Sequence, residues 1–429
     1  MHTQERQILS VKLKSSLFYK SIRRKDEEKM VNTRKVTDHI TWVGADEHRL
    51  ALFENLFPIP RGVSYNSYLI RDEKNALLDT VDSAVTRQFI ENIQDALDGQ
   101  SLDYLVINHM EPDHCANIEE LMVRFPEMKI VCNKKTLDMI HQFYEMNLEE
   151  HTILVKEGDK LELGSHTLSF YFAPMVHWPE VMVSFEETEK VLFSADAFGS
   201  FGALNGALFN DELDFDKEWL DDARRYYSNI VGKYGTQVQS ALKKLSALPI
   251  QMICPLHGPV WRTDLAYFLN KYDLWSRYEP EEKAAVILYG SMYGNTENAA
   301  GILARRLREK GVKKVAVYDV SSTHISTLIS EIFRASHLVL AAPTYNNGIY
   351  PAMSNLLHDM KALCVQNRTV GLMENGTWAP TCGKQVKAAL EELKNMRILE
   401  PMVSIKSSLK EASLAQIESL AEAMAEELR

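Results

Sequence analysis

The last third of the chain alternates between strand-like and helix-like segments, and this alternation restricts the possible fold most strongly. Short apolar runs rich in β-branched residues occur at Ala285–Tyr289, Val315–Val320, Leu338–Ala342, Thr369–Met373 and Met402–Ile405. Helical patterns accompany them, for example at Thr296–Lys310, Pro351–Leu363 and Leu414–Leu428. Repeated strand–helix units predict an α/β domain with a doubly wound parallel sheet over residues 284–429.

The preceding half of the chain is richer in strands. Strand-like runs occur at Ser67–Ile70, Ala76–Asp79, Tyr104–Asn108, Lys129–Cys132, Thr167–Phe172, Met182–Phe185, Val191–Ser194 and Gln251–Cys254. Helical stretches lie between some of them, such as Val85–Leu97 and Asp222–Leu245. This mixture predicts a layered α+β domain built on two sheets over residues 31–275. The charged segment 276–283, which contains Pro280, is typical of a linker.

Composition excludes several classes of protein. The formal net charge of −11 disfavours nucleic acid and anionic membranes as partners, and no apolar run approaches the roughly 20 residues that span a bilayer. The five cysteines form no C-x-x-C pair, so we expect neither a disulfide framework nor a four-cysteine iron site. We also expect a cytoplasmic location, where cysteines stay reduced. The basic leader, residues 1–30, lacks the apolar core of a secretory signal. We expect it to be disordered or to precede the true start at Met30.

Potential metal ligands are concentrated after the strand-like run Tyr104–Asn108. The hexapeptide that follows holds His109, Glu111, Asp113 and His114, and three more candidates each follow an apolar run: His177, Asp196 and His257. Carboxylates and imidazoles packed this densely repel or compete unless a cation joins them. Seven ligands exceed the need of one ion and suit a pair of divalent ions, which Asp196 can bridge. The carboxylate of Glu111 makes the site harder and favours iron over zinc.

A second group of polar loops follows the strands of the C-terminal half. The first connects Val286–Gly290 to a helix and holds Ser291, Met292, Tyr293, Gly294, Asn295 and Thr296. Its hydroxyls and backbone N–H groups at a helix N-terminus suit a terminal phosphate. Two later loops carry an aromatic residue and several amides: Pro343, Thr344, Tyr345, Asn346, Asn347 and Gly348, then Asn375, Gly376, Thr377 and Trp378. One phosphate loop with two aromatic-bearing loops resembles flavodoxin, and this resemblance implies an FMN site.

The order of these segments is similar to the metallo-β-lactamase superfamily, and a Glu at position 111 makes the chain resemble the flavodiiron family specifically. The resemblance implies an αββα metallo-β-lactamase-like sandwich followed by a flavodoxin-like domain. It implies that one iron takes His109, Glu111 and His177. The other would take Asp113, His114 and His257, with Asp196 as the bridge. In some members the residue matching His114 turns away, so its role as a ligand stays open.

The resemblance also implies a function. FMN would pass electrons to a non-haem diiron site, which would reduce O2 to water, NO to N2O, or both. The electron donor would be a separate rubredoxin-like protein. The assembly would be a head-to-tail homodimer, or a dimer of dimers, in which the FMN of one chain faces the irons of its partner.

Two alternatives stay open at this point. One is a dinuclear metal hydrolase with a flavodoxin-like regulatory domain, although Glu111 argues against it. The other is an electron carrier whose diiron domain is vestigial, although all seven ligand positions are filled. The remaining histidines lack ligand-like spacing, and we interpret them as surface or hydrogen-bonded core residues: His39, His48, His141, His151, His166, His324, His337 and His358.

Overall fold

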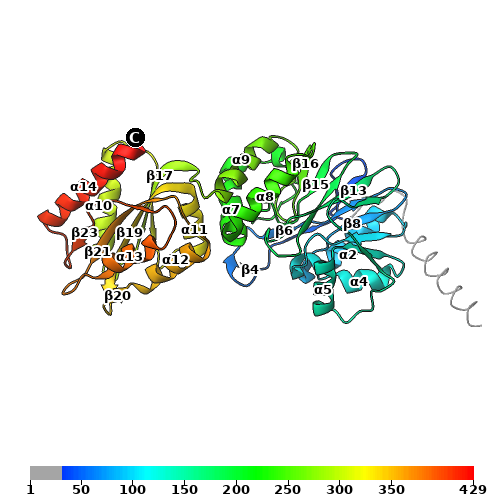
Figure 1. Ribbon diagram of the computed structural model, residues 1–429, viewed down its shortest axis with the longest axis horizontal. Helices are drawn as coiled ribbons and strands as arrows, with labels where there is room; N and C mark the ends of the chain where they lie inside the picture. The colour runs from blue at the N-terminus through cyan, green and yellow to red at the C-terminus, as the bar shows by residue number, and fades with distance from the viewer. Residues whose placement is uncertain (1–30) are drawn as a thin grey trace, which may run out of the picture.

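The computed structural model describes residues 31–429, so the expectation for residues 1–30 lies outside the described residues. The chain forms two bodies that lie side by side, one from the N-terminal half and one from the C-terminal half (Figure 1). None of the described helices combines the length and apolar content that a membrane crossing requires.

The first body is a sandwich of two sheets with helices outside it, as expected from the sequence. One sheet has the order β1 (Arg34–Lys35), β2 (Ile40–Trp42), β7 (Tyr68–Ile70), β8 (Ala76–Leu78), β9 (Tyr104–Val106), β10 (Lys129–Cys132) and β11 (Thr152–Leu154). The other has the order β12 (Lys160–Glu162), β13 (Thr167–Phe172), β14 (Met182–Glu186), β15 (Val191–Phe193) and β16 (Met252–Cys254). β15 and β16 are parallel, with Phe193 opposite Cys254, so their C-terminal ends meet.

Helices cover both outer faces of this sandwich. On one side lie α2 (Thr86–Leu97), α4 (Ile118–Arg124) and α5 (Lys134–Phe143), and on the other α7 (Leu220–Tyr226), α8 (Gly235–Leu245) and α9 (Leu265–Ser276) (Figure 1). Two short hairpins complete the body: β3 (Ala45–Glu47) with β6 (Val63–Tyr65), and β4 (Leu52–Phe53) with β5 (Phe57–Pro58). The sandwich thereby buries strands on both faces, and β2, β7, β8 and β15 are buried at every position.

The predicted helix over Asp222–Leu245 is wrong as a single helix. The chain leaves the α-helical path after α7, passes through a π-helical turn at Tyr227–Val231 and a tight turn at Gly232–Tyr234, and resumes as α8. Helix α8 begins at Gly235, close to the end of α9, and a Cβ atom added at Gly235 would lie 2.3 Å from the carbonyl oxygen of Ser276. This close approach requires glycine at the start of α8.

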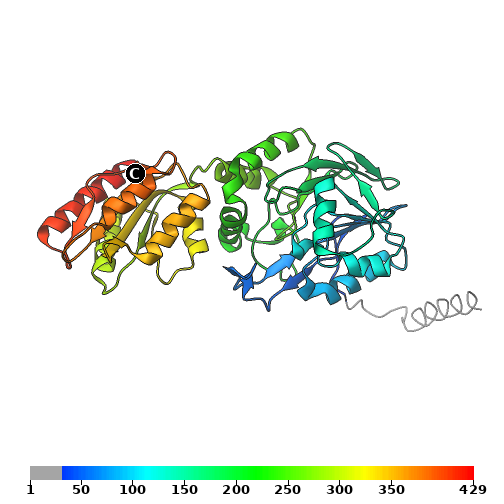
Figure 2. The ribbon, with the colours of Figure 1, turned by 60° about the horizontal axis from the view of Figure 1, so that its bottom comes forward.

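The second body is the parallel α/β sheet predicted from the sequence. Its strands have the order β18 (Val315–Asp319), β17 (Glu282–Tyr289), β19 (Ala335–Tyr345), β21 (Thr369–Asn375) and β22 (Arg397–Ile398), and β23 (Val403–Ile405) also pairs with β21. Helices α10 (Asn295–Glu309) and α14 (Glu411–Leu428) cover one face, and α11 (Ile325–Arg334), α12 (Pro351–Ala362) and α13 (Cys382–Glu391) cover the other (Figure 2). The strand order 2-1-3-4-5 is that of a flavodoxin-like sheet.

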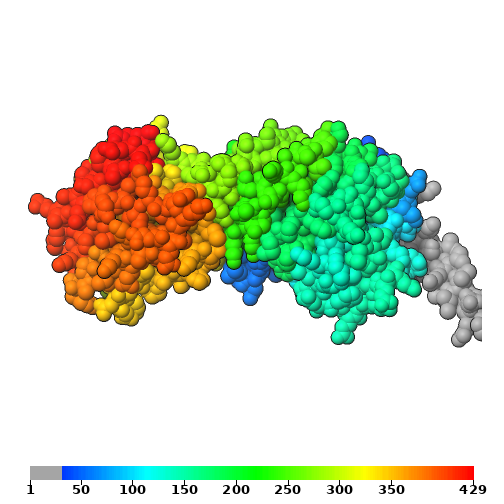
Figure 3. Space-filling model, viewed as in Figure 1, coloured from blue at the N-terminus to red at the C-terminus, as the bar shows by residue number. Residues whose placement is uncertain are grey.

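The two bodies are in direct contact. Helix α7 packs against α11, and Arg225 and Asn229 hydrogen-bond to Ser326 across the junction. Between α9 and β17, the carboxylate of Glu281 pairs with the buried guanidinium of Arg224, whose Nε lies 2.7 Å from Oε1. The space-filling view shows the two halves touching without an opening on the face seen (Figure 3).

Candidate metal centre and ligand pocket

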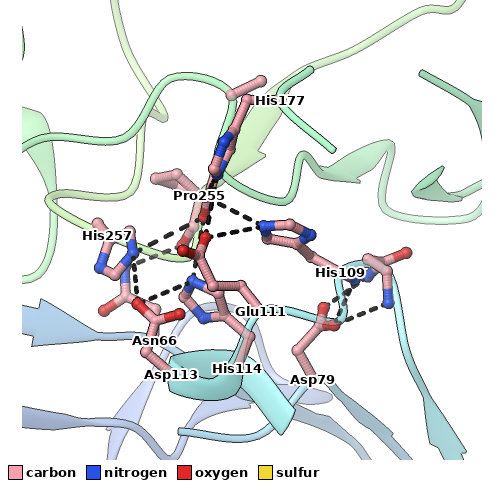
Figure 4. A network of polar contacts seen from close by, with 12 residues as sticks. Asn66, Asp79, His109, Glu111, Asp113, His114, His177, Pro255 and His257 are labelled. Carbon is pink, nitrogen blue, oxygen red and sulfur yellow. Dashed lines mark hydrogen bonds and ion pairs between the residues drawn. The ribbon is translucent and has the colours of Figure 1, made fainter. Parts of the chain in front are cut away.

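The seven predicted metal ligands converge at one end of the sandwich (Figure 4). His109 follows β9, Asp196 follows β15 and His257 follows β16. Asp113 and His114 lie on the short helix α3 (Pro112–Cys115). The remaining two ligands, Glu111 and His177, lie in loops beside them. β9 belongs to one sheet, and β15 and β16 belong to the other. The C-terminal ends of all three strands lie at the same end of the sandwich, so the fold itself gathers the ligands.

The ligand atoms fall into two groups that meet at Asp196. In each group the atoms lie within 4.8 Å of one another; one holds His109, Glu111, His177 and Asp196, and the other holds Asp113, His114 and His257. Oδ2 of Asp196 lies 3.1 Å from Nε2 of His177, and Oδ1 lies 3.1 Å from Nε2 of His114. The two carboxylate oxygens of Asp196 therefore face different groups, as a bridging ligand must.

Several of these buried atoms have no hydrogen-bond partner within residues 31–429. They are both carboxylate oxygens of Asp113, both ring nitrogens of His114, Oδ1 of Asp196 and Nε2 of His257. Burying polar atoms without partners costs free energy, and metal ions between them would remove this cost. Burial opposes protonation of His109, yet Asp196 and Glu111 outweigh it and raise the pKa of this imidazole well above its ordinary value. The site is thus strongly negative, and its donors fit two divalent cations.

Residues outside the ligand set hold the ligands in place. Nδ1 of His109 lies 2.8 Å from Oε1 of Glu180, and Nδ1 of His257 lies 2.8 Å from the carbonyl oxygen of Ser64. Both contacts turn Nε2 toward the centre, which is how outer partners orient metal-binding imidazoles. Asp79 accepts hydrogen bonds from the backbone N–H groups of Asn108 and His109, at 2.7 and 3.1 Å, and so fixes the ligand loop.

Two further polar groups border the centre, and the sequence did not indicate them. Tyr226 is fully buried, its ring centroid lies 5.5 Å from that of His257, and its hydroxyl has no hydrogen-bond partner among residues 31–429. Glu54 lies at the tip of the β4–β5 hairpin and is exposed as a residue, but its carboxyl group hydrogen-bonds to Glu111. Burial of that carboxyl group and the charge of Glu111 raise the pKa of Glu54 to about 8.

A pocket of about 620 Å³ opens at the C-terminal ends of the strands of the second body. Most residues of the three predicted loops line it: Ser291, Met292, Tyr293, Asn295, Thr296, Pro343, Thr344, Tyr345, Asn346, Asn347, Asn375, Gly376, Thr377 and Trp378. Gly294 and Gly348 do not line it. Gly294 instead has φ +85° just before α10, and its N–H donates to the Ser291 hydroxyl at 3.1 Å. Ala379 and Ser407 also line the pocket.

The chemistry of this pocket suits a flat ligand with an anionic end. The N-terminus of α10, a helix of 15 residues, begins beside Ser291 and Thr296 and offers unpaired N–H groups to an anion. Aromatic side chains stand at the rim with little cover, since Trp378 is 87% and Tyr293 90% exposed. Exposed apolar faces around a pocket are typical of surfaces that a ligand or partner covers.

Comparisons with known proteins agree with this arrangement. The ODP family beta lactamase model matches residues 63–258, and the Flavodoxin model matches residues 287–416. The chain is 34% identical over 352 residues to the anaerobic nitric oxide reductase flavorubredoxin of Aeromonas hydrophila, which covers 80% of this chain and 70% of that protein. The rubredoxin oxygen:oxidoreductase of Desulfovibrio gigas superposes with a TM-score of 0.84 at 32% identity, covering 92% of this chain and 98% of that one. The flavodiiron protein of Giardia intestinalis superposes with a TM-score of 0.83 at 25% identity, covering 94% and 100%.

Proposed function

Because this chain belongs to the flavodiiron protein family, we propose that it passes electrons from FMN to two irons and there reduces O2, NO or both. It is an oxidoreductase with FMN and a non-haem diiron centre as cofactors. When bound, FMN takes up electrons and releases them singly, and the irons bind and reduce the gas. The observation that carries the proposal is the pair of ligand groups joined through Asp196.

The ligand assignment follows from these groups. His109, Glu111 and His177 would hold one iron, and Asp113, His114 and His257 the other, with Asp196 between them. His114 is included because its Nε2 lies 3.3 Å from Oδ2 of Asp113 and 3.1 Å from Asp196, so it faces the centre. The hydroxyl of Tyr226 has no hydrogen-bond partner within residues 31–429, and its ring lies beside that of His257, so this hydroxyl would be available as a hydrogen-bond donor at the centre.

The flavin assignment uses the pocket in residues 284–429. Ser291, Thr296 and the N-terminus of α10 would hold the phosphate, and Tyr345 and Trp378 would lie against the ring system. Asn346 and Asn375 have amide groups that can hydrogen-bond to its polar edge.

The electrons would come from a separate rubredoxin-like donor, since this sequence holds no four-cysteine iron site. The five cysteines are all free, which is compatible with a reducing cytoplasm, where we place the activity. The metal ligands and the pocket share no residue, and the pocket rim is exposed. We therefore expect a head-to-tail dimer, or a dimer of dimers, in which the rim of one chain covers the metal centre of its partner.

The test has two parts. Metal and flavin analysis of protein produced with adequate iron should give about two irons and one FMN per chain, one iron for each ligand group. The reduced protein is then mixed anaerobically with O2 and with NO in parallel, and consumption of each gas is measured. Zinc in place of iron, or no turnover of either gas, would reject the proposal and revive the hydrolase alternative.

A further inference from the structure

A second cluster of metal-binding side chains lies at the other end of the sandwich. His39, His166 and Glu189 each offer one ligand atom, and these atoms lie within 4.8 Å of one another. His39 precedes β2 in one sheet, whereas His166 and Glu189 lie in the β12–β13 and β14–β15 turns of the other. Since Glu189 precedes β15 and Asp196 follows it, the cluster and the diiron ligands lie at opposite ends of this strand.

The side chains of this cluster face one another directly. Nδ1 of His39 lies 3.0 Å from Oε1 of Glu189, and the rings of His39 and His166 have centroids 4.7 Å apart. The hydroxyl of Thr37 donates to Oε2 of Glu189 at 2.5 Å, which leaves Oε1 turned toward the two imidazoles. Two imidazole nitrogens and one carboxylate oxygen thus converge on a common point.

An outer carboxylate fixes the orientation of His166. Nδ1 of His166 lies 2.8 Å from Oδ2 of Asp72, which also accepts the backbone N–H of His166 at 2.7 Å. Because Nδ1 is engaged, Nε2 is the nitrogen left for a ligand, as in carboxylate–histidine–metal arrangements. Gly164 permits this approach, since a Cβ atom there would lie 2.7 Å from Oδ1 of Asp72. The side chains of His166 and Asp72 are only 2% and 8% exposed, so the pair is built into the fold.

The carboxylates at the cluster also favour binding of a cation. Two carboxylates, those of Glu189 and Asp72, contact the two imidazoles. Within residues 31–429, no lysine or arginine forms an ion pair with either carboxylate; their ion pairs are with His166 and His39. A divalent cation would neutralise both.

We propose that His39, His166 and Glu189 bind one zinc ion, with Asp72 as the outer partner of His166. Two imidazoles and one carboxylate are a common zinc ligand set that leaves a fourth position for water. His39 is 52% exposed, so the ion and this water have access from solvent. The ion would join a turn before β2 to two turns of the opposite sheet and so hold the two sheets together at this end. Neither histidine has ligand-like spacing in the sequence, because the fold brings them together from segments far apart.

The test is zinc binding to the iron- and FMN-loaded protein in competition with a chromophoric chelator. The wild type should bind one zinc per chain beyond the iron centre. His39→Ala and Glu189→Gln should weaken binding more than 100-fold, and Asp72→Asn by about 10- to 100-fold. The matched control is His141→Ala, an exposed histidine outside the cluster, which should bind zinc as the wild type does.

Two further measurements test the zinc site even if one of the variants folds poorly. Zinc should raise the unfolding temperature of the wild type and of His141→Ala but not that of His39→Ala, whose side chain is half exposed and whose loss leaves the buried pair intact. Anomalous diffraction at the zinc edge should place the ion between His39 and His166. Equal zinc affinity in all variants, or zinc found only at the iron ligands, would overturn the proposal without affecting the proposed gas reduction.

Discussion

Asp196 lies between the two groups of candidate metal ligands. It is 1% exposed, and its two oxygens each face a different group of ligands. The cluster of these side chains could be predicted from the sequence because each follows a strand-like run or lies in one dense hexapeptide, whereas their role as metal ligands stays a prediction. The residues that hydrogen-bond to the members of this cluster could not be predicted. Glu180, Ser64 and Asp79 act through hydrogen bonds to segments up to 193 residues away, and nothing in their local sequence indicates this role.

Replacing Asp196 by Ala should abolish gas reduction while FMN stays bound and reducible. The bridge is lost, and the paired cations lose a shared negative charge, so we expect turnover to fall more than about 100-fold, beyond the cost of outer-shell changes. Gas consumption and photoreduction of the flavin are measured on the same sample. Asp138→Ala, which removes an exposed carboxylate paired with Lys134, is the control and should retain activity. Near-normal turnover by Asp196→Ala would refute the bridging role.

Replacing Glu180 by Gln tests the orientation of His109. The amide can still accept a hydrogen bond, but the charge that favours the metal-binding form of the imidazole is gone. Iron affinity should fall by about 10- to 100-fold. Iron retention during dialysis against a chelator measures this. Glu187→Gln, at a surface pair with Lys160, is the matched control and should retain iron like the wild type. Equal retention by both variants would contradict the role given to Glu180.

At the scale of elements, regular segments were predictable and interruptions were not. The predicted strands of the α/β sheet correspond to β17, β18, β19, β21 and β23, and the three predicted helices correspond to α10, α12 and α14. The two-residue strands β20 and β22 were not predicted. The break between α7 and α8 at Tyr227–Tyr234 was missed, because π-helical and 3₁₀ turns have no distinct signature in the apolar periodicity of a sequence. Helix α7 ends at Tyr226, whose ring packs against that of His257.

The N-terminus of α10 gives a prediction at this scale. Gly294 has φ +85°, a conformation that side chains rarely adopt, and it precedes the helix end proposed to hold the phosphate. Gly294→Asp adds strain and a negative charge beside the phosphate. Bound FMN, measured by its absorbance, should fall more than about 10-fold, which is the effect of about 1.4 kcal/mol. Iron content should not change.

The control for this prediction lies in the same helix. Gly301 has open space around its Cα, so Gly301→Ala should fold and bind FMN normally. If Gly294→Asp retained a full complement of flavin, the phosphate would have to lie elsewhere in the pocket.

For the molecule as a whole, the comparisons show both domain types in one chain, whereas the assembly stays a prediction. The exposed rim around Trp378 and Tyr293 is the structural reason to expect a partner there. A sequence can indicate apolar residues in loops, but it cannot show whether the fold of the same chain covers them. Here the fold leaves them uncovered.

Mixing two inactive variants tests the assembly. Asp196→Ala retains the flavin site and Gly294→Asp retains the iron ligands. If electrons cross between chains, a mixed dimer has one working junction of two, and half of the dimers in an equal mixture are mixed. Activity should therefore recover to about a quarter of wild type after full subunit exchange. Exchange is verified with differently tagged chains. No recovery, or a fully active isolated monomer, would show that electrons do not cross the interface.

The anchored segment between α9 and β17 limits how the chain can move. The guanidinium of Arg368 is fully buried and donates to the carbonyl oxygens of Tyr278, Ile332 and Phe333, and Arg224 holds Glu281 beside it. Bending the chain here would leave these buried N–H donors without acceptors and without access to water. Such a change costs several kcal/mol. We therefore expect the two bodies of one chain to move together as a single rigid unit. In the proposed dimer, the distance between flavin and irons would then change only when whole subunits shift, so treatments that loosen subunit packing should slow electron transfer before they unfold either body.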